Sequence, residues 1–228
     1  MRLGSGAVAI VMVVVLAGCA TGRRPVSIAR ESSSRPTDAA TAIARTEAEA
    51  RTYRYRVTIH ADGDGGRVVL QADGAADRDH GVFLLATDVA AIAPELGGPL
   101  TIIATASATF VQCPSLGRVL HASTPWIRTG GAAADALRAT TVDPFRVLDT
   151  ATPAGASTGG DVVVALGDDG LVRRVTVRFD GAAGSGDAVL VVELFDIGLP
   201  VDIAPPAPDQ VTDETDALNR LFGGATGG

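Results

Sequence analysis

Hydrophobic and polar residues alternate strictly along residues 53–60, which read YRYRVTIH. In an extended chain, alternate side chains point to opposite faces, so one face is apolar and the other polar. The apolar side chains are Tyr53, Tyr55, Val57 and Ile59. This pattern predicts a half-buried strand, and the glycine- and aspartate-rich residues 62–66 predict a hairpin turn into a second strand over 67–72.

Further short apolar runs, each bounded by turn residues, predict more strands over 81–87, 100–106, 108–112, 118–122, 126–128, 161–166, 171–179 and 188–195. Good helix formers without glycine or proline predict a helix over 39–52. Short helical pieces are expected between 131 and 150, and a last helix carries Leu218 and Leu221 with Asp213 and Thr215 as caps. Many strands with little helix predict an α+β fold dominated by an antiparallel sheet.

Two late strands, 161–166 and 188–195, are apolar on both faces instead of alternating. A strand of this kind needs cover on each face, from helices, from curling of the sheet or from a ligand. The pattern therefore fits a ligand cavity, and it fits a dry core covered by helices equally well.

The N-terminus has the features of an export signal. Arg2 precedes an apolar run from Ala7 to Leu16, which is too short to span a bilayer of about 30 Å. The run ends in Leu16-Ala17-Gly18-Cys19, which resembles the bacterial lipobox. The resemblance implies that residues 1–18 are a lipoprotein signal peptide and that Cys19 is acylated and becomes the first residue of the mature chain. We predict an anchor in the membrane through Cys19, because two or more acyl chains give stable insertion.

Residues 19–38 are rich in Ser, Arg, Thr and Pro and predict a flexible tether. Its four arginines could contact anionic lipid headgroups, and the segment could equally be a solvated spacer. We assign residues 39–222 to a single β-rich domain and residues 223–228 to a glycine-rich tail.

Composition narrows the classes of function. The basic residues, all arginine, number 19 against 26 acidic ones, for a net charge of −7, which speaks against nucleic-acid binding. The chain has two cysteines. If Cys19 is acylated, Cys113 is a free thiol, which we expect to be a small buried hydrophobe.

Patterns that suggest catalysis or metal binding are incomplete. Residues 155–159 fit G-x-S-x-G, but they precede a strand, and no histidine follows His121. His60 and His80 are distant from each other and from His121, unlike metal ligands. Asp62 and Asp64 lack the downstream glutamate of a calcium loop. We therefore predict no catalytic residue, no metal and no cofactor.

Three segments carry a resemblance to a known family: DIGLPVDIAPPAPDQVTD over 196–213, TPWIR over 124–128 and DDGLVRR over 168–174. Together with the lipobox, they resemble actinobacterial lipoproteins of the LppX/LprG (LprAFG) family. The resemblance implies a LolA-like fold, in which an antiparallel half-barrel sheet wraps around a few helices and encloses a hydrophobic cavity for acylated lipids or glycolipids. Residues 149–161 form a Gly/Ala/Ser/Thr loop where relatives carry a further strand, which implies a smaller cavity.

We therefore expect a non-catalytic lipoprotein on the extracytoplasmic face of the cell membrane that binds or transfers an acylated lipid or glycolipid. The alternative is a tethered interaction or scaffold module without a ligand cavity. The side chains expected to line the cavity are Tyr55, Val57, Ile59, Val68, Leu70, Val175, Val177 and Val191.

Overall fold

The computed structural model describes residues 36–63, 66–91, 97–137, 143–145, 162–179 and 188–223. The elements in chain order are α2 (Pro36–Glu49), β1 (Thr52–Gly63), β2 (Gly66–Asp77), β3 (Val82–Asp88), a 3-10 turn η1 (Val89–Ala91), β4 (Pro99–Ala104), β5 (Thr109–Gln112), α3 (Pro114–Leu120), β6 (Trp126–Thr129), α4 (Gly131–Leu137), β7 (Val162–Leu166), β8 (Val172–Phe179), β9 (Ala188–Phe195), a 3-10 turn η4 (Pro208–Gln210), β10 (Val211–Asp213) and α6 (Thr215–Gly223).

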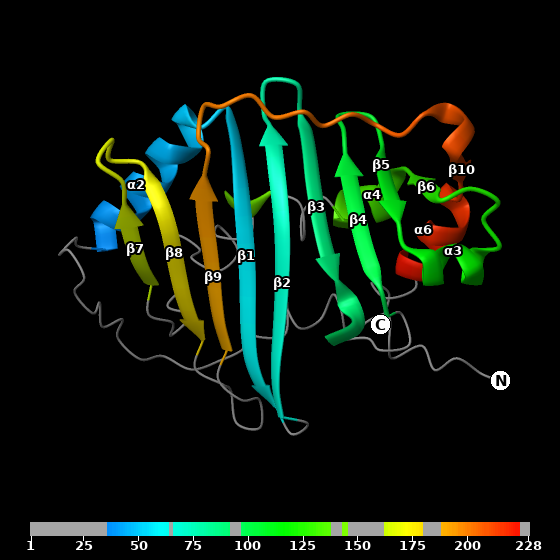
Figure 1. Cartoon of the computed structure of the whole chain (residues 1–228), viewed down its shortest axis with the longest axis horizontal. Coiled ribbons are helices and arrows are strands. Elements are labelled where there is room, and N and C mark those ends of the chain that lie inside the picture. The colour runs from blue at the N-terminus through cyan, green and yellow to red at the C-terminus, as the bar shows by residue number, and fades with distance from the viewer. Residues whose placement is uncertain are drawn as a thin grey trace.

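The described strands form one open ten-stranded sheet in the order β10-β6-β5-β4-β3-β2-β1-β9-β8-β7 (Figure 1). All neighbours are antiparallel except β10 and β6. The long strand β1 lies inside the sheet, paired with β2 on one side and β9 on the other. The predicted α+β class, an antiparallel sheet with few helices, is confirmed.

Most predicted elements agree with the structure. The expected helix is α2, which begins three residues earlier, at Pro36, and ends at Glu49. The strand predicted over 118–122 is wrong, because these residues mostly belong to helix α3. Pro114 occupies the first turn of α3, where its missing N–H costs nothing, and His121 ends it in the left-handed conformation at φ 54°.

The C-terminal part of the chain crosses the ends of most of the strands, from β9 to the β10 edge. Residues 196–210, here called the strap, leave β9 and run along the strand ends to β10 at the far edge (Figure 1). At its start, the Gly198 N–H donates to the Thr52 carbonyl at 2.8 Å. At its end, β10 pairs with β6 in parallel. The strand β10 was not predicted, since its three residues follow a proline-rich run.

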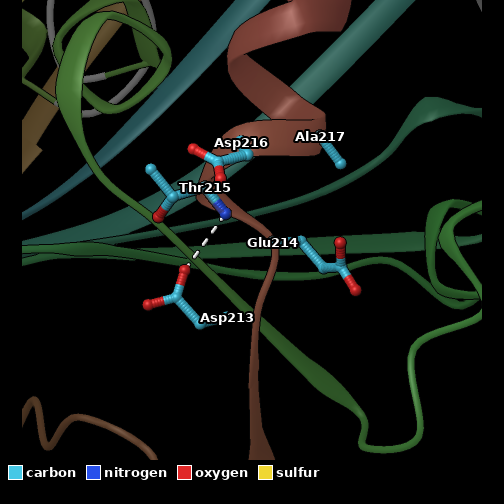
Figure 2. Close-up of a pocket in the computed structure, with 5 residues that line it drawn as sticks. All are labelled: Asp213, Glu214, Thr215, Asp216 and Ala217. Atoms are coloured by element: carbon cyan, nitrogen blue, oxygen red, sulfur yellow. Dashed lines mark hydrogen bonds between the residues drawn. The ribbon is translucent and has the colours of Figure 1, made fainter.

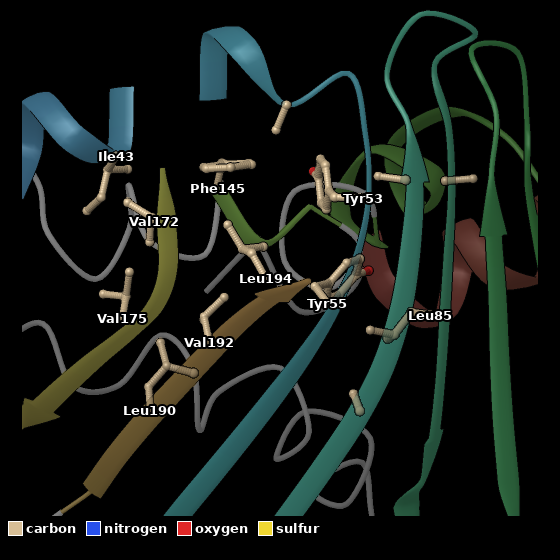
Figure 3. Packing of buried hydrophobic residues seen from close by; sticks show 14 of the residues in the cluster. Ile43, Tyr53, Tyr55, Leu85, Phe145, Val172, Val175, Leu190, Val192 and Leu194 are labelled. Carbon is tan, nitrogen blue, oxygen red and sulfur yellow. The ribbon is translucent and has the colours of Figure 1, made fainter. Parts of the chain in front are cut away.

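Strand register divides the sheet into two faces. We call the face that carries Tyr53, Tyr55, Val57 and Ile59 the inner face, and the opposite one the outer face. The main hydrophobic cluster forms on the inner face. It is completed by Ile43 of α2, by Ala50 just after that helix, and by Phe145. Figure 3 shows this packing, with Tyr53 and Tyr55 beside Phe145 and the aliphatic side chains of β8 and β9.

Tyr55 packs flat across a glycine of the neighbouring strand. It is fully buried and opposite Gly74 in the β1–β2 ladder. A Cβ atom on Gly74 would lie 2.1 Å from Tyr55 Cζ, so only glycine leaves room for the ring. The Tyr55 hydroxyl passes over β2 and donates to the Leu84 carbonyl of β3 at 3.1 Å. One side chain thus ties three strands together.

A second aromatic contact, beside Tyr55, lies next to helix α2. Tyr53 meets Phe145 edge to face, with ring centroids 5.6 Å apart. The Arg78 guanidinium lies 5.5 Å from the Phe145 ring centroid and forms an ion pair with Glu47 of α2 at 3.0 Å. Phe145 is therefore held between the sheet and an arginine that also contacts the helix.

Thr46 docks α2 onto the sheet through its hydroxyl. The side chain is fully buried. Its Oγ1 donates to the Ala42 carbonyl and accepts the Val172 N–H of β8, both at 2.8 Å. Thr109 and Thr129, opposite each other on β5 and β6, are buried just as fully, but neither hydroxyl has a hydrogen-bond partner among the residues that the structure describes.

We expect Thr46→Val to lower the free energy of unfolding by about 1–3 kcal/mol, because it leaves the buried Val172 N–H without an acceptor. Thr109→Val is the matched control. It removes an equally buried hydroxyl that bonds nothing, so its effect should be neutral or stabilising. Urea unfolding followed by circular dichroism measures both. Equal losses for the two variants would contradict this account of α2 docking.

We expect Gly74→Ala to destabilise the fold by at least about 1–3 kcal/mol, because the new methyl group collides with the Tyr55 ring. Gly117→Ala in α3, where a Cβ meets nothing within 4 Å, should instead stabilise it by about 0.4–1 kcal/mol. Combining Gly74→Ala with Tyr55→Leu should cost less than the sum of the two single changes. Strict additivity, measured by thermal unfolding, would contradict the Tyr55–Gly74 contact.

Candidate functional site

The inner face carries two aliphatic rows that cross the strands on the side of the β1–β2 turn. Cα pairing defines both rows. The first is Val162, Val177, Leu190, Ile59 and Leu70. The second is Val164, Val175, Val192, Val57, Ala72, Thr87 and Leu100. Inward side chains on neighbouring strands thus form one continuous apolar surface.

Burial changes along these rows. On β8 and β9 the inward residues are buried, with Val175 and Val192 at 0% exposure. On β1 and β2 four residues remain only half-buried, and we call them the inner patch: Val57, Ile59, Val68 and Leu70. The patch ends where Tyr55 fills the space beside Gly74. The inner face therefore has a closed part around the tyrosines and a less covered aliphatic part toward the hairpin turn.

The two rows offer a ligand almost no polar group. Thr87 is their one polar member, and its hydroxyl already donates to the Gln71 carbonyl at 2.7 Å. Recognition at the inner patch would therefore depend on apolar burial and shape, because no unsatisfied donor or acceptor of the rows orients a ligand there.

Seven of the eight residues expected to line a cavity lie on the inner face: Tyr55, Val57, Ile59, Val68, Leu70, Val175 and Val177. Val191 does not join them. It pairs with Thr58 and Thr176, so its side chain lies on the outer face, where it is nevertheless only 8% exposed. In a strand that is apolar on both faces, hydrophobicity does not show which side is inward. A cavity bounded by the seven residues stays a prediction.

Sequence reasoning missed seven members of the rows, which are Val162, Val164, Leu190, Val192, Ala72, Thr87 and Leu100. Each was inside or beside a predicted strand, but its face depends on which strand is its neighbour. The partner order β7-β8-β9 and β2-β3-β4 supplies that information. The alternation signal of β1 was strong enough to find Val57 and Ile59, whereas β4 and β7 show no alternation.

The outer face is polar where it backs the inner patch. Arg54, Arg56, Thr58 and His60 alternate with the inward residues of β1. Arg56 Nε lies 2.7 Å from Asp73 Oδ1 across the β1–β2 ladder. Both side chains are about half exposed, so the pair contributes little to stability. The contrast in polarity between the faces makes the inner face the candidate site.

A separate hollow of about 550 Å³ lies at the start of α6, lined by Asp213, Glu214, Thr215, Asp216 and Ala217 (Figure 2). It is open and polar. The Thr215 hydroxyl and backbone N–H donate to Asp213 and hold the pKa of that carboxyl below its usual range, with help from Arg128. Asp213 therefore acts as the expected cap of α6. None of the residues predicted to line a cavity borders this hollow.

The candidates for chemistry remain scattered. His60 lies on β1, His80 pairs with Asp77 at the surface, and His121 ends α3. In the part of the chain that the structure describes, no cluster of three or more His, Cys, Asp or Glu residues could hold a metal ion. Burial raises the pKa of the Tyr53 and Tyr55 hydroxyls, which keeps both protonated.

Cys113 is a free cysteine at 6% exposure, with Sγ 3.3 Å from Ser115 Oγ, which fits the expected buried packing role. Residues 1–18, predicted to be a signal peptide, Cys19 and residues 155–159 lie outside the described residues. Among the helices of the described ranges, none is long and apolar enough to cross a membrane.

Comparisons with known proteins give fold likenesses alone. No family model matches the chain, and no curated protein does. The structure is similar to LprF from Mycobacterium bovis, at 14% identity and a TM-score of 0.37, over 77% of this chain and 100% of that one. It is also similar to an uncharacterized conserved protein from Thermus thermophilus, at 10% identity and a TM-score of 0.36, over 77% and 98% of the two chains. The function proposed below therefore rests on the residues of the inner face and not on these likenesses.

Proposed function

We propose that this chain is an exported lipoprotein, anchored through Cys19, that holds the acyl chain of a lipid or glycolipid on its inner face and carries out no catalysis. The observation that carries the proposal is the half-buried inner patch of Val57, Ile59, Val68 and Leu70. It continues directly into the buried aliphatic residues of β8 and β9.

An acyl chain is the occupant that suits this surface. The rows are aliphatic and run across the strands, so an extended chain of methylenes fits them better than a ligand that needs hydrogen bonds. The rows include partly exposed residues on β1 and β2, at Val57, Ile59 and Leu70. Burial of apolar surface at about 25 cal/mol per Å² would supply the affinity.

The anchor and the patch support each other. A lipid bound at the inner patch must come from a membrane or another carrier, and the lipobox-like Leu16-Ala17-Gly18-Cys19 supports a location of the domain at a membrane surface. The competing function, a tethered scaffold module, requires the chain's own side chains to cover the patch. The half-buried state of Val68 and Leu70 favours the lipid, because among the described side chains neither packs against a hydrophobic cluster.

Binding is tested with a fluorescent fatty-acid probe added to the purified full chain. Leu70→Asn should weaken binding about tenfold, since the loss of one buried leucine contact is worth about 1.5 kcal/mol or more. The matched control is Val69→Asn, one residue earlier on β2 and 45% exposed on the outer face, which should bind as the parent does. No saturable binding, or equal weakening by both changes, would reject the inner patch as a lipid site.

The anchor is tested separately by cell fractionation. Cys19→Ala should move the chain out of the lipid-modified membrane pool, because the acyl chains that hold it are absent. Cys113→Ala removes the other cysteine, a buried one, and should leave the chain in that pool. Metabolic labelling with an alkyne fatty acid reads out the modification directly, and label retained in Cys19→Ala would exclude acylation at this residue.

A further inference from the structure

Strand β7 forms one edge of the open sheet. Among the described residues it pairs with β8 alone. An edge strand presents backbone N–H and C=O groups that its own sheet leaves unpaired, and these can pair with another extended strand. Helix α2 packs over the neighbouring strand β8, through Thr46 and Val172.

The sequence of β7 lacks the charged residues and prolines that protect many edge strands. Its five residues are VVVAL, without charge, proline or glycine. Leu166 is 49% exposed, Ala165 is exposed and Val163 is half-buried. A bulge lies between Ala165 and Leu166, which leaves Val162–Ala165 with regular strand pairing. Natural sheets normally place lysine, proline or a very short strand at such a position.

The opposite edge is protected in that way. Strand β10 has only three residues, ends in Asp213 and follows Pro208. It continues at once into α6, whose residue Leu218 is buried against Ile127 and Ala133. The two ends of the sheet therefore differ, and only β7 has the length and composition of a pairing surface.

We propose that two copies of this chain associate through β7, edge to edge and antiparallel, into one continuous sheet. A second copy is the occupant because a two-fold axis makes an antiparallel strand its own complementary partner. Charge favours the same place. The chain has a net charge of −7, but Val162–Leu166 carry none, and the adjacent Asp169 is paired with Arg173 at 2.6 Å. The five residues of the edge itself therefore bring no charge of one copy against a charge of the other.

Register supports the pairing. If Val164 lies opposite its symmetry mate, Val162 of one copy lies opposite Leu166 of the other. The exposed Leu166, which pairs with the inward residue Val172, is then covered by an aliphatic side chain. Val163 lies opposite Ala165 on the outer face, so each face stays continuous from one copy to the next.

The contact is small. Stable dimers bury about 1,200–2,000 Å² in total, and one pair of five-residue strands covers less, so we expect a dissociation constant of about 10–100 µM. Confinement of both copies to one surface raises their effective concentration, and the dimer would form there more readily than in dilute solution.

Cross-linking of the full chain in membranes tests the geometry. The double variant Val163→Cys with Ala165→Cys, treated with a short bis-maleimide, should give a cross-linked dimer. The matched control has the same spacing on the outer face of a central strand: Val69→Cys with Gln71→Cys. No dimer at the edge pair, or an equal yield at the control pair, would overturn the proposal.

Sedimentation velocity of the detergent-solubilised full chain gives the second measurement. The parent should show a dimer that increases with concentration, and Ala165→Lys should remain a monomer with an unchanged melting temperature, because two lysines would flank the edge. Val69→Lys, a control charge on β2, should dimerise like the parent. Leu70→Asn should dimerise too, which separates this proposal from lipid binding. A monomeric parent, or dimerisation of Ala165→Lys, would refute the β7 interface.

Discussion

The contact of Tyr55 with Gly74 determines how the inner face is divided. A tyrosine placed across a glycine fills the space that a side chain on β2 would occupy, and its hydroxyl reaches β3 at Leu84. The sheet is therefore closed by aromatic packing on one side of this contact, where Tyr53, Phe145 and Arg78 gather. On the other side Val57, Ile59, Val68 and Leu70 of β1 and β2 are aliphatic and remain half-buried. The boundary between a packed core and an available apolar surface follows from one residue pair.

Alternation along β1 was sufficient to predict both faces of that strand, because residues 53–60 alternate between apolar or aromatic and polar side chains without a break. The helix α2 and the caps of α6 also followed from local signals. Residues 118–122 were misread, because Leu116 and Leu120 face a small cluster around Ile127 at helical spacing, and the proline that starts α3 precedes the segment that was read as a strand. Val191 could not be placed from sequence, since its strand is apolar on both faces and register alone decides the direction of its side chain.

The site itself was partly predictable for a related reason. Lining residues on β1, β2 and β8 were found because each strand alternates, but the rows that they form depend on strand order. The order β7-β8-β9-β1-β2 places residues from both ends of the chain side by side, and no local pattern indicates such long-range pairing. The same order explains why Thr109 and Thr129 face each other with unpartnered hydroxyls: each is a reasonable strand residue alone, and the cost arises only when β5 meets β6.

The strap has a mechanical consequence. It joins β9 to β10 across the ends of six intervening strands, a span of about 34 Å at about 4.8 Å per strand spacing. Residues 196–210 include four prolines, which keep this segment extended and leave it little slack. An open sheet flexes most easily by changing its twist and spreading its two ends. A stiff connection between β9 and β10 resists that motion over the strands between them, so this part of the sheet is held at one curvature although both edges of the sheet are open.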